Sequence, residues 1–149
     1  MKTPSPTPGR ILEDDDEIGA LLENTRRIAV VGIKTRESMQ PAYYVPEYAQ
    51  RSGYDIVPVP VYYPEATEIL GQKVYRSLAA IPGNVDMVNM FRRPKDLAAH
   101  LDDILAKKPR SVWLQLGIRD DAFAGRLTAA GIDVVQDRCL LVELRSHGR

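Results

Sequence analysis

The stretch Ile28-Ala29-Val30-Val31-Gly32 decides the fold of this chain. It is a short, uninterrupted apolar run that ends at a glycine. Such a run predicts a β-strand whose two faces are both buried, which is typical of the interior of a parallel sheet. Four further segments of this kind follow it, at residues 54–59, 85–91, 112–116 and 132–135. We therefore expect five strands.

Helical patterns alternate with these strands. Apolar residues at helical spacing predict helices within residues 11–24, 38–53, 94–108 and 120–130, and residues 140–145 form a terminal segment. In the second helix we expect Ser38 as the cap and Pro41 in the first turn. The alternation indicates an α/β fold, namely a Rossmann-like three-layer sandwich with a five-stranded, mostly parallel sheet.

We expect the strand order 3-2-1-4-5, in which the second strand is interior. Pro58 and Pro60 belong to this second strand or follow it directly. Proline fits only the end of a strand or the edge of a sheet, because it has no N–H to donate. Ligands of such sheets bind at the carboxyl ends of the strands.

Size and composition narrow the classes of function. The length of 149 residues suits one domain, which we expect at residues 11–149. Residues 1–10 are rich in proline and lack an apolar core, so we expect a disordered tail that is neither a signal peptide nor a membrane anchor. The formal net charge is zero, which argues against nucleic acid and membranes as partners. The lone Cys139 and two histidines exclude a disulfide and a structural zinc site, and they suit the cytoplasm.

The turn after the first strand carries groups that bind anions. Helix amides, two cations and two hydroxyls make a credible pyrophosphate site here. The residues of this candidate site are Gly32, Ile33, Lys34, Thr35, Arg36 and Ser38. The alternative is an ordinary strand-to-helix turn whose charges are solvated.

The pattern expected for a nicotinamide dinucleotide is mostly missing. Lys34 and Glu37 stand where the second and third glycines of Gly-x-Gly-x-x-Gly would be. The second strand also lacks an acid at its end for the ribose hydroxyls, because it runs into Val59 and Pro60. These two residues can instead form an apolar wall for an adenine ring.

The ends of the third and fourth strands complete the candidate cleft. Phe91, Arg92 and Arg93 offer apolar surface and anion-pairing groups, although an arginine there can also lie over the sheet edge in solvent. Gln115 can reach the cleft or satisfy a backbone group.

Several sequence blocks together carry a family resemblance. They are Val30–Gly32, Gly53–Val59, Gly71–Leu78, Ile81-Pro82, Val85-Asp86, Phe91–Pro94, Val112–Gly117 and Asp137–Cys139. In combination the chain resembles the small stand-alone coenzyme A-binding proteins. Their domain is similar to the coenzyme A-binding domain of the succinyl-CoA synthetase α subunit and of ADP-forming acyl-CoA synthetases. The resemblance covers residues 22–145.

The resemblance implies coenzyme A (CoA) or an acyl-CoA as ligand. Its pyrophosphate is then expected at residues 32–38, its adenosine near Val59 and Pro60, and its pantetheine along Phe91 and Arg92. Two departures concern these positions. Many relatives have Asn-Pro where this chain has Val59-Pro60, and Lys34 replaces a small hydroxyl residue.

The sequence offers no convincing catalytic or metal-binding group. His100 is expected to be a surface residue without a partner constellation. Cys139 is expected to be a packing residue, with a mixed disulfide to the CoA thiol as the alternative. Together with the CoA ligand that the resemblance implies, the sequence predicts a non-catalytic CoA-binding protein that serves as a carrier, a sensor or a regulator. An NAD(P)-binding oxidoreductase, a subunit in acyl-CoA ligase chemistry, a pure protein-interaction domain, and a homodimer or partner protein stay open.

Overall fold

The computed structural model describes residues 7–149; the first part of the expected tail, residues 1–6, lies outside the described residues. The helices are α1 (Asp15–Glu23), α2 (Pro41–Arg51), α3 (Pro94–Leu97), α4 (Leu101–Lys107), α5 (Asp121–Ala129) and α6 (Leu140–Ser146), with short 3₁₀ helices η1 (Arg36–Ser38) and η2 (Ala98–His100). The strands are β1 (Arg27–Val31), β2 (Asp55–Val59), β3 (Glu68–Ile69), β4 (Gln72–Lys73), β5 (Met87–Met90), β6 (Ser111–Leu114) and β7 (Asp133–Val135). None of the helices within residues 7–149 has the length and apolar character needed to cross a membrane.

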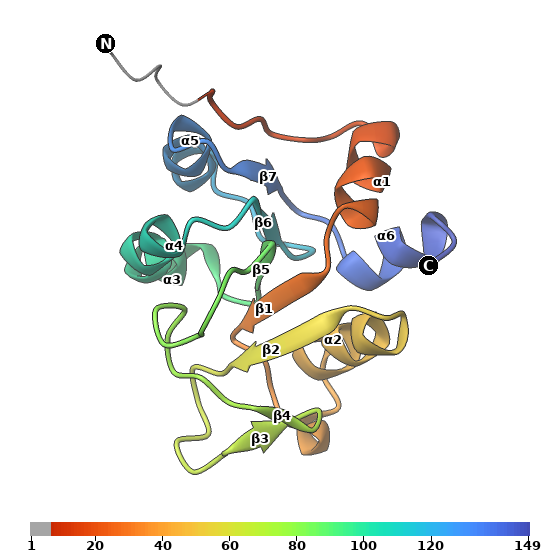
Figure 1. Cartoon of the computed structure of the whole chain (residues 1–149), viewed down its shortest axis with the longest axis vertical. Helices are drawn as coiled ribbons and strands as arrows, with labels where there is room; N and C mark the ends of the chain where they lie inside the picture. Colours follow the sequence, from red (N-terminus) through yellow and green to blue (C-terminus); the bar gives the residue numbers. More distant parts are fainter. Residues whose placement is uncertain (1–6) are drawn as a thin grey trace.

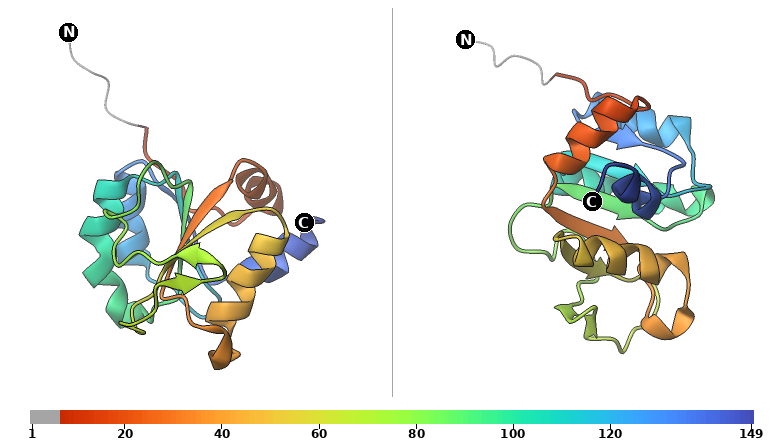
Figure 2. Two further views of the ribbon diagram at one scale, coloured as in Figure 1. Left: turned by 60° about the horizontal axis from the view of Figure 1, so that its bottom comes forward. Right: turned by 90° about the vertical axis from the view of Figure 1, so that its right-hand side faces the viewer.

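Five strands form one parallel sheet between two layers of helices. The order is β2-β1-β5-β6-β7, and every neighbouring pair is parallel. Helices α1, α2 and α6 cover one face of the sheet, and α3, α4 and α5 cover the other (Figures 1 and 2). The α/β class, the five-stranded sheet and the Rossmann-like layers predicted from the sequence are confirmed.

Strand β1 shows how alternation fills both layers. Ile28 and Val30 belong to the core cluster that contains α1, α2 and α6 residues. Ala29 and Val31 belong to the cluster under α3, α4 and α5. All four side chains are almost completely buried, at 2% exposure or less. The strand is therefore apolar from Ile28 to Val31 because both of its faces are covered there.

The order of the strands differs from the expected 3-2-1-4-5. Counted along the chain, the five strands of the sheet run 2-1-3-4-5, so β2 is at the edge and β5 pairs with the other side of β1. Pro58 gives the physical reason, since a residue without an N–H cannot complete a ladder on both sides of an interior strand. Of the two positions that the prolines allowed, a strand end or a sheet edge, β2 occupies the edge, and this excludes the interior position that the expected order required.

The connection from β2 to β5 crosses back over β1 without a helix. Its first part forms the antiparallel β3–β4 hairpin, which projects beyond β2 (Figure 1). Its second part packs Leu78, Ile81 and Val85 into the α3, α4 and α5 side of the core. The chain then enters β5, where Asp86 accepts hydrogen bonds from the N–H groups of Arg26 and Arg27 at 3.0 and 2.9 Å. This carboxylate aligns the starts of β1 and β5.

The ordered N-terminal segment lies alongside β7. The N–H of Leu12 donates to Val134 O at 2.8 Å, and the N–H of Val134 donates to Arg10 O at 2.9 Å. Gly9 also donates to Thr128 O. Helix α1 accordingly begins at Asp15 and not at residue 11, with Asp14 accepting from the Asp16 N–H at 2.8 Å as its cap.

We predict that Trp113→Ala lowers the free energy of unfolding by about 3–5 kcal/mol. Trp113 on β6 is fully buried, and its Nε1–H donates to Arg138 O at 2.8 Å. The substitution removes this packing and leaves a carbonyl unsatisfied. Urea unfolding followed by circular dichroism measures the change. Val142→Ala, at a side chain that is 58% exposed, is the control and should change stability by less than about 0.5 kcal/mol. Equal effects of both substitutions would contradict the assignment of Trp113 to the core.

Candidate functional site

The carboxyl ends of β1 and β5 approach each other closely at Gly32. Gly32 has a φ of +86°, and a Cβ added to it would lie 2.4 Å from the carbonyl oxygen of Phe91. The Gly32 N–H donates to Val59 O at 2.9 Å, and the Phe91 N–H donates to Val31 O at 2.9 Å. The backbones after β1, β2 and β5 therefore meet at one point, where only glycine fits. In this strand order, the direction of the connections reverses between β1 and β5, where such sheets bind ligands.

Arg92 lies directly beside this point. Its Cδ would be 3.4 Å from a Cβ on Gly32, and its side chain is only 16% exposed. The Arg92 Nε–H donates to Nε2 of His100 at 3.2 Å, and Nη2 lies 3.9 Å from Oδ2 of Asp96. A fixed, largely buried guanidinium at a strand end is suited to pairing with an anion.

His100 is not the isolated surface residue expected from the sequence. The expected helix 94–108 is interrupted by η2, and this 3₁₀ turn ends at His100. Burial lowers the pKa of His100, and the nearby positive charge of Arg92 lowers it further. Its contact with Arg92 was not expected from the sequence. The available signal was the four-residue spacing of Asp96 and His100, which puts them on one side of a helical segment, with Arg92 just before that segment begins.

The loop after β1 is longer than a simple turn and contains η1. Helix α2 begins at Pro41 with Gln40 as the N-cap, so Ser38 is not the cap residue. Ser38 instead accepts a hydrogen bond from the Gln40 N–H at 3.2 Å, because η1 separates it from α2. Nζ of Lys34 donates to Oε1 of Gln40 at 3.2 Å. The loop thus holds the Lys34 ammonium close to the start of α2.

The surroundings of Glu37 stabilise a negative charge in this loop. Hydrogen bonding to its own backbone N–H lowers the pKa of the Glu37 carboxyl, and the Thr35 side chain lowers it further. The side chain is fully exposed. These interactions favour the ionised form of the Glu37 carboxyl.

A hollow of about 440 Å³ separates this loop from the β3–β4 hairpin. Thr35, Arg36 and Tyr43 line it on one side, and residues 68–71 line it on the other. We call it the hairpin hollow. It extends the carboxyl edge beyond β2, in the direction where the resemblance implies the adenosine.

Three of the remaining predicted residues are less open than expected. Ile33 is 1% exposed and Val59 is 4% exposed, and both side chains belong to core clusters. Pro60 is also buried. The exposed apolar side chains after β2 are instead Val61 and Tyr62, at 38% and 59% exposure. If an adenine ring packs here, these two side chains offer the accessible surface.

Phe91, Arg93 and Gln115 have different surroundings. Phe91 is half-buried against the α1, α2 and α6 side of the core. Arg93 lies in solvent, with its side chain 69% exposed and its Nε 3.2 Å from Asp96. Gln115 is 4% exposed, and its Oε1 accepts from Nδ2 of Asn89 and from the N–H of Leu140, both at 3.3 Å. Of the two roles considered for Gln115, the structure shows that it satisfies a backbone group.

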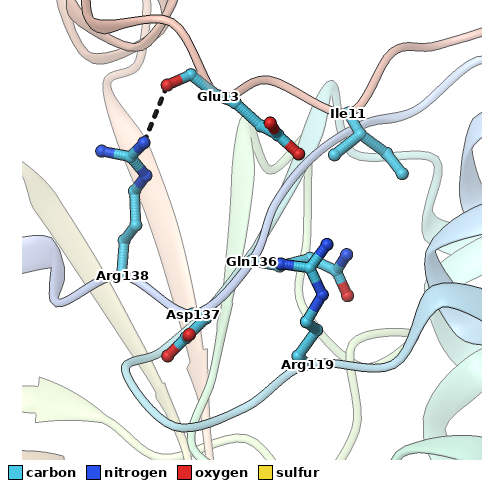
Figure 3. A pocket seen from close by; sticks show the side chains of 6 residues that line it. All are labelled: Ile11, Glu13, Arg119, Gln136, Asp137 and Arg138. Carbon is cyan, nitrogen blue, oxygen red and sulfur yellow. Dashed lines mark hydrogen bonds between the residues drawn. The ribbon is translucent and has the colours of Figure 1, made fainter.

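A second hollow lies at the far end of the same edge, beyond β6 and β7. It has a volume of about 470 Å³, and its side chains come from the N-terminal segment, from Arg119 and from residues 136–138 (Figure 3). Arg138 donates to Glu13 O at 2.7 Å and to Oε1 of Glu143 at 2.6 Å. Arg138 therefore anchors the N-terminal segment. Cys139 follows it at the N-cap position of α6 and packs partly buried against the core.

A model described as CoA binding domain matches residues 26–145, which is well over half of the 149 residues. The chain belongs to this family. The uncharacterized protein YneT of Bacillus subtilis (strain 168) is 34% identical over 126 residues, covering 85% of this chain and 90% of YneT.

Solved structures of similar chains have the same architecture. The cell-free ID.343 protein of Thermus thermophilus is 40% identical, with a TM-score of 0.83, covering 91% of this chain and 99% of that chain. A hypothetical protein from Pyrococcus horikoshii OT3 is 28% identical with a TM-score of 0.83, and each chain is covered completely. A dinucleotide-forming acetyl-coenzyme A synthetase of Ca. Korarchaeum cryptofilum is 19% identical with a TM-score of 0.61, covering 72% of this chain and 25% of the synthetase. This last likeness concerns the fold alone.

We predict that Gly32→Ala destabilises the protein by at least about 2 kcal/mol more than Gly53→Ala does. Both glycines have positive φ, but a Cβ on Gly53 meets no atom within 4 Å, whereas a Cβ on Gly32 meets the Phe91 carbonyl. The difference therefore isolates the close approach of β1 and β5. Denaturant unfolding of both variants measures it.

Gly125→Ala is the second control for this measurement. Gly125 lies inside α5 with open space around it, so alanine should stabilise the protein by about 0.5–1 kcal/mol. Equal losses for Gly32→Ala and Gly53→Ala would show that backbone conformation, and not the contact, requires glycine at position 32.

Proposed function

We propose that the protein binds CoA or an acyl-CoA at the carboxyl edge of the sheet. The observation that carries the proposal is the junction at Gly32, where the guanidinium of Arg92 lies beside the meeting point of three backbones. Membership of the CoA binding domain family supports the same ligand. In this proposal the pyrophosphate lies over Gly32 and the loop after it, within reach of Lys34, Arg36 and Arg92.

The distribution of charge supports an anionic ligand at this place. The chain as a whole is neutral, so an anion must be held by local cations. Ion pairs within residues 7–149 engage seven arginines, among them Arg92, but neither Lys34 nor Arg36. These last two cations are available to a phosphate without first breaking an ion pair.

The proposed role is non-catalytic: a carrier, a sensor or a regulator of CoA or acyl-CoA in the cytoplasm. His100 and Cys139, the side chains with the most obvious chemical reactivity, are engaged with Arg92 and with core packing respectively. An NAD(P)-dependent oxidoreductase is less well supported, because the edge strand β2 ends at Val59 without an acid for ribose hydroxyls. A role beside a ligase subunit and the oligomeric state stay predictions.

We predict that CoA raises the melting temperature and that 3′-dephospho-CoA raises it less. Ligand binding to the native state stabilises it by mass action, and the additional phosphate adds charge-assisted contacts. NAD and NADP at the same concentrations should give smaller shifts. A thermal-shift series with the four ligands measures this, and native mass spectrometry of the purified protein would detect co-purified CoA or acyl-CoA. A larger shift with either dinucleotide would overturn the assignment, and no shift with any ligand would favour a protein-interaction domain.

We predict that combining Lys34→Ala and Arg36→Ala weakens CoA binding by about tenfold to a hundredfold without unfolding the protein. Neither side chain is part of the core, so the loss should fall on the ligand. Isothermal titration calorimetry measures the affinity. Arg126→Ala on the exposed side of α5 removes a positive charge elsewhere and should leave the affinity unchanged. An affinity equal to that of the wild type in the double variant would show that the loop does not hold the phosphates.

A further inference from the structure

We infer that His100 is a positioning residue: its unprotonated Nε2 holds Arg92 beside Gly32, so that anion binding at the carboxyl edge weakens as the solution is acidified. The inference rests on the proposed function for its ligand, but the His100–Arg92 contact itself does not. His100 lies in η2, the turn before α4. It contacts Arg92 and not the ligand site directly, so the sequence did not suggest this role.

The chemistry of the two side chains fixes the protonation state of this contact. An arginine guanidinium stays protonated and carries donors only. The 3.2 Å contact between Arg92 Nε and His100 Nε2 therefore requires a lone pair on Nε2. A doubly protonated imidazole has no such lone pair. The hydrogen bond consequently exists only while His100 is neutral.

The charged groups around His100 come from three segments. Arg92 reaches it from the loop after β5, Asp96 lies on α3, and Asp103 lies on α4. The Asp96 carboxylate already pairs with two arginines, at 3.9 Å to Arg92 and 3.2 Å to Arg93. Both oxygens of Asp103 accept from the backbone, at 2.8 Å from the Leu78 N–H and 3.1 Å from the Ala79 N–H. The carboxylates of Asp96 and Asp103 are therefore already engaged with partners other than His100.

The balance of these surroundings favours neutral His100 at neutral pH. Burial and Arg92 lower its pKa, and together they outweigh the raising effects of Asp103 and Asp96. Because folded His100 binds a proton less readily than the unfolded chain does, its contribution to stability is present above the ordinary histidine pKa of 6.5. That contribution is lost as the pH falls through the lower pKa of the folded state.

Protonation of His100 would place two cations in contact and release Arg92 at its Nε. The remaining partner of Arg92 is Asp96, at 3.9 Å and shared with Arg93. The guanidinium would then need to be ordered again by the incoming anion, and this cost reduces affinity. Neutral His100 thus pre-orders the Arg92 guanidinium beside Gly32.

The test compares His100→Leu with His100→Gln by calorimetric titration of CoA at about pH 7.5 and at a pH below the His100 pKa that the nuclear magnetic resonance titration described below measures. At the higher pH, His100→Leu should bind CoA about tenfold more weakly, because Arg92 loses its acceptor. His100→Gln keeps an acceptor oxygen and should bind nearly as tightly as the wild type. On acidification the wild type should lose several-fold more affinity than His100→Gln. The titration of the CoA phosphate itself affects both proteins equally.

Circular dichroism at both pH values verifies that each variant is folded. Wild-type affinity in His100→Leu, or the same pH profile for wild type and His100→Gln, would overturn the inference. If the wild type binds no CoA at either pH, the proposed function fails instead. The next measurement then tests the His100–Arg92 contact independently of CoA.

Nuclear magnetic resonance titration of the two histidines tests the contact without a ligand. His147→Gln assigns the signals, because His147 is the only other histidine. His100 should titrate below the ordinary histidine pKa in the wild type, and Arg92→Met should raise its pKa by removing the adjacent positive charge. An ordinary histidine pKa that Arg92→Met does not move would refute the contact, whatever the outcome with CoA.

Discussion

The close approach of the Gly32 backbone to the Phe91 carbonyl is the constraint on which the carboxyl edge depends. Because residue 32 has no side chain, β1 and β5 can end side by side and Arg92 can lie across the join. The Gly32 N–H also binds the end of β2 through Val59. The absence of a Cβ at Gly32 thus allows three strand ends and the Arg92 guanidinium to lie together. The loop that carries Lys34 and Arg36 starts at this glycine.

The sequence was sufficient for the five strands of the main sheet, and it was insufficient for their lateral order. Apolar runs and helical spacing predicted each strand of the sheet, because every strand is covered on both faces and the pattern is local. The order depends on which side of β1 accepts β5, and this is decided by contacts distant in sequence. Pro58 was the local clue to it, since it allows β2 only at an edge.

The roles of individual site residues were harder to predict, because each depends on a partner far along the chain. Gln115 is committed to Asn89 and to the backbone of Leu140, and no spacing pattern announces either contact. Val59 lies where it was expected, yet its side chain belongs to the core. Gly32 and Arg92 were both expected at the carboxyl edge of the sheet, but their direct contact depends on the pairing of β1 with β5, which the expected strand order did not include.

The structure of the two lateral edges of the sheet affects whether the protein can aggregate in a crowded solution. On the β7 side, residues 10–12 satisfy the outer backbone groups of Val134. On the β2 side, Pro58 offers no N–H, and its carbonyl already accepts from the Tyr75 N–H at 3.0 Å. An open edge would be a template for strand addition by another chain, and both of these edges are blunted. Self-assembly of this domain would therefore have to use helices and loops, leaving the sheet itself resistant to edge-to-edge aggregation.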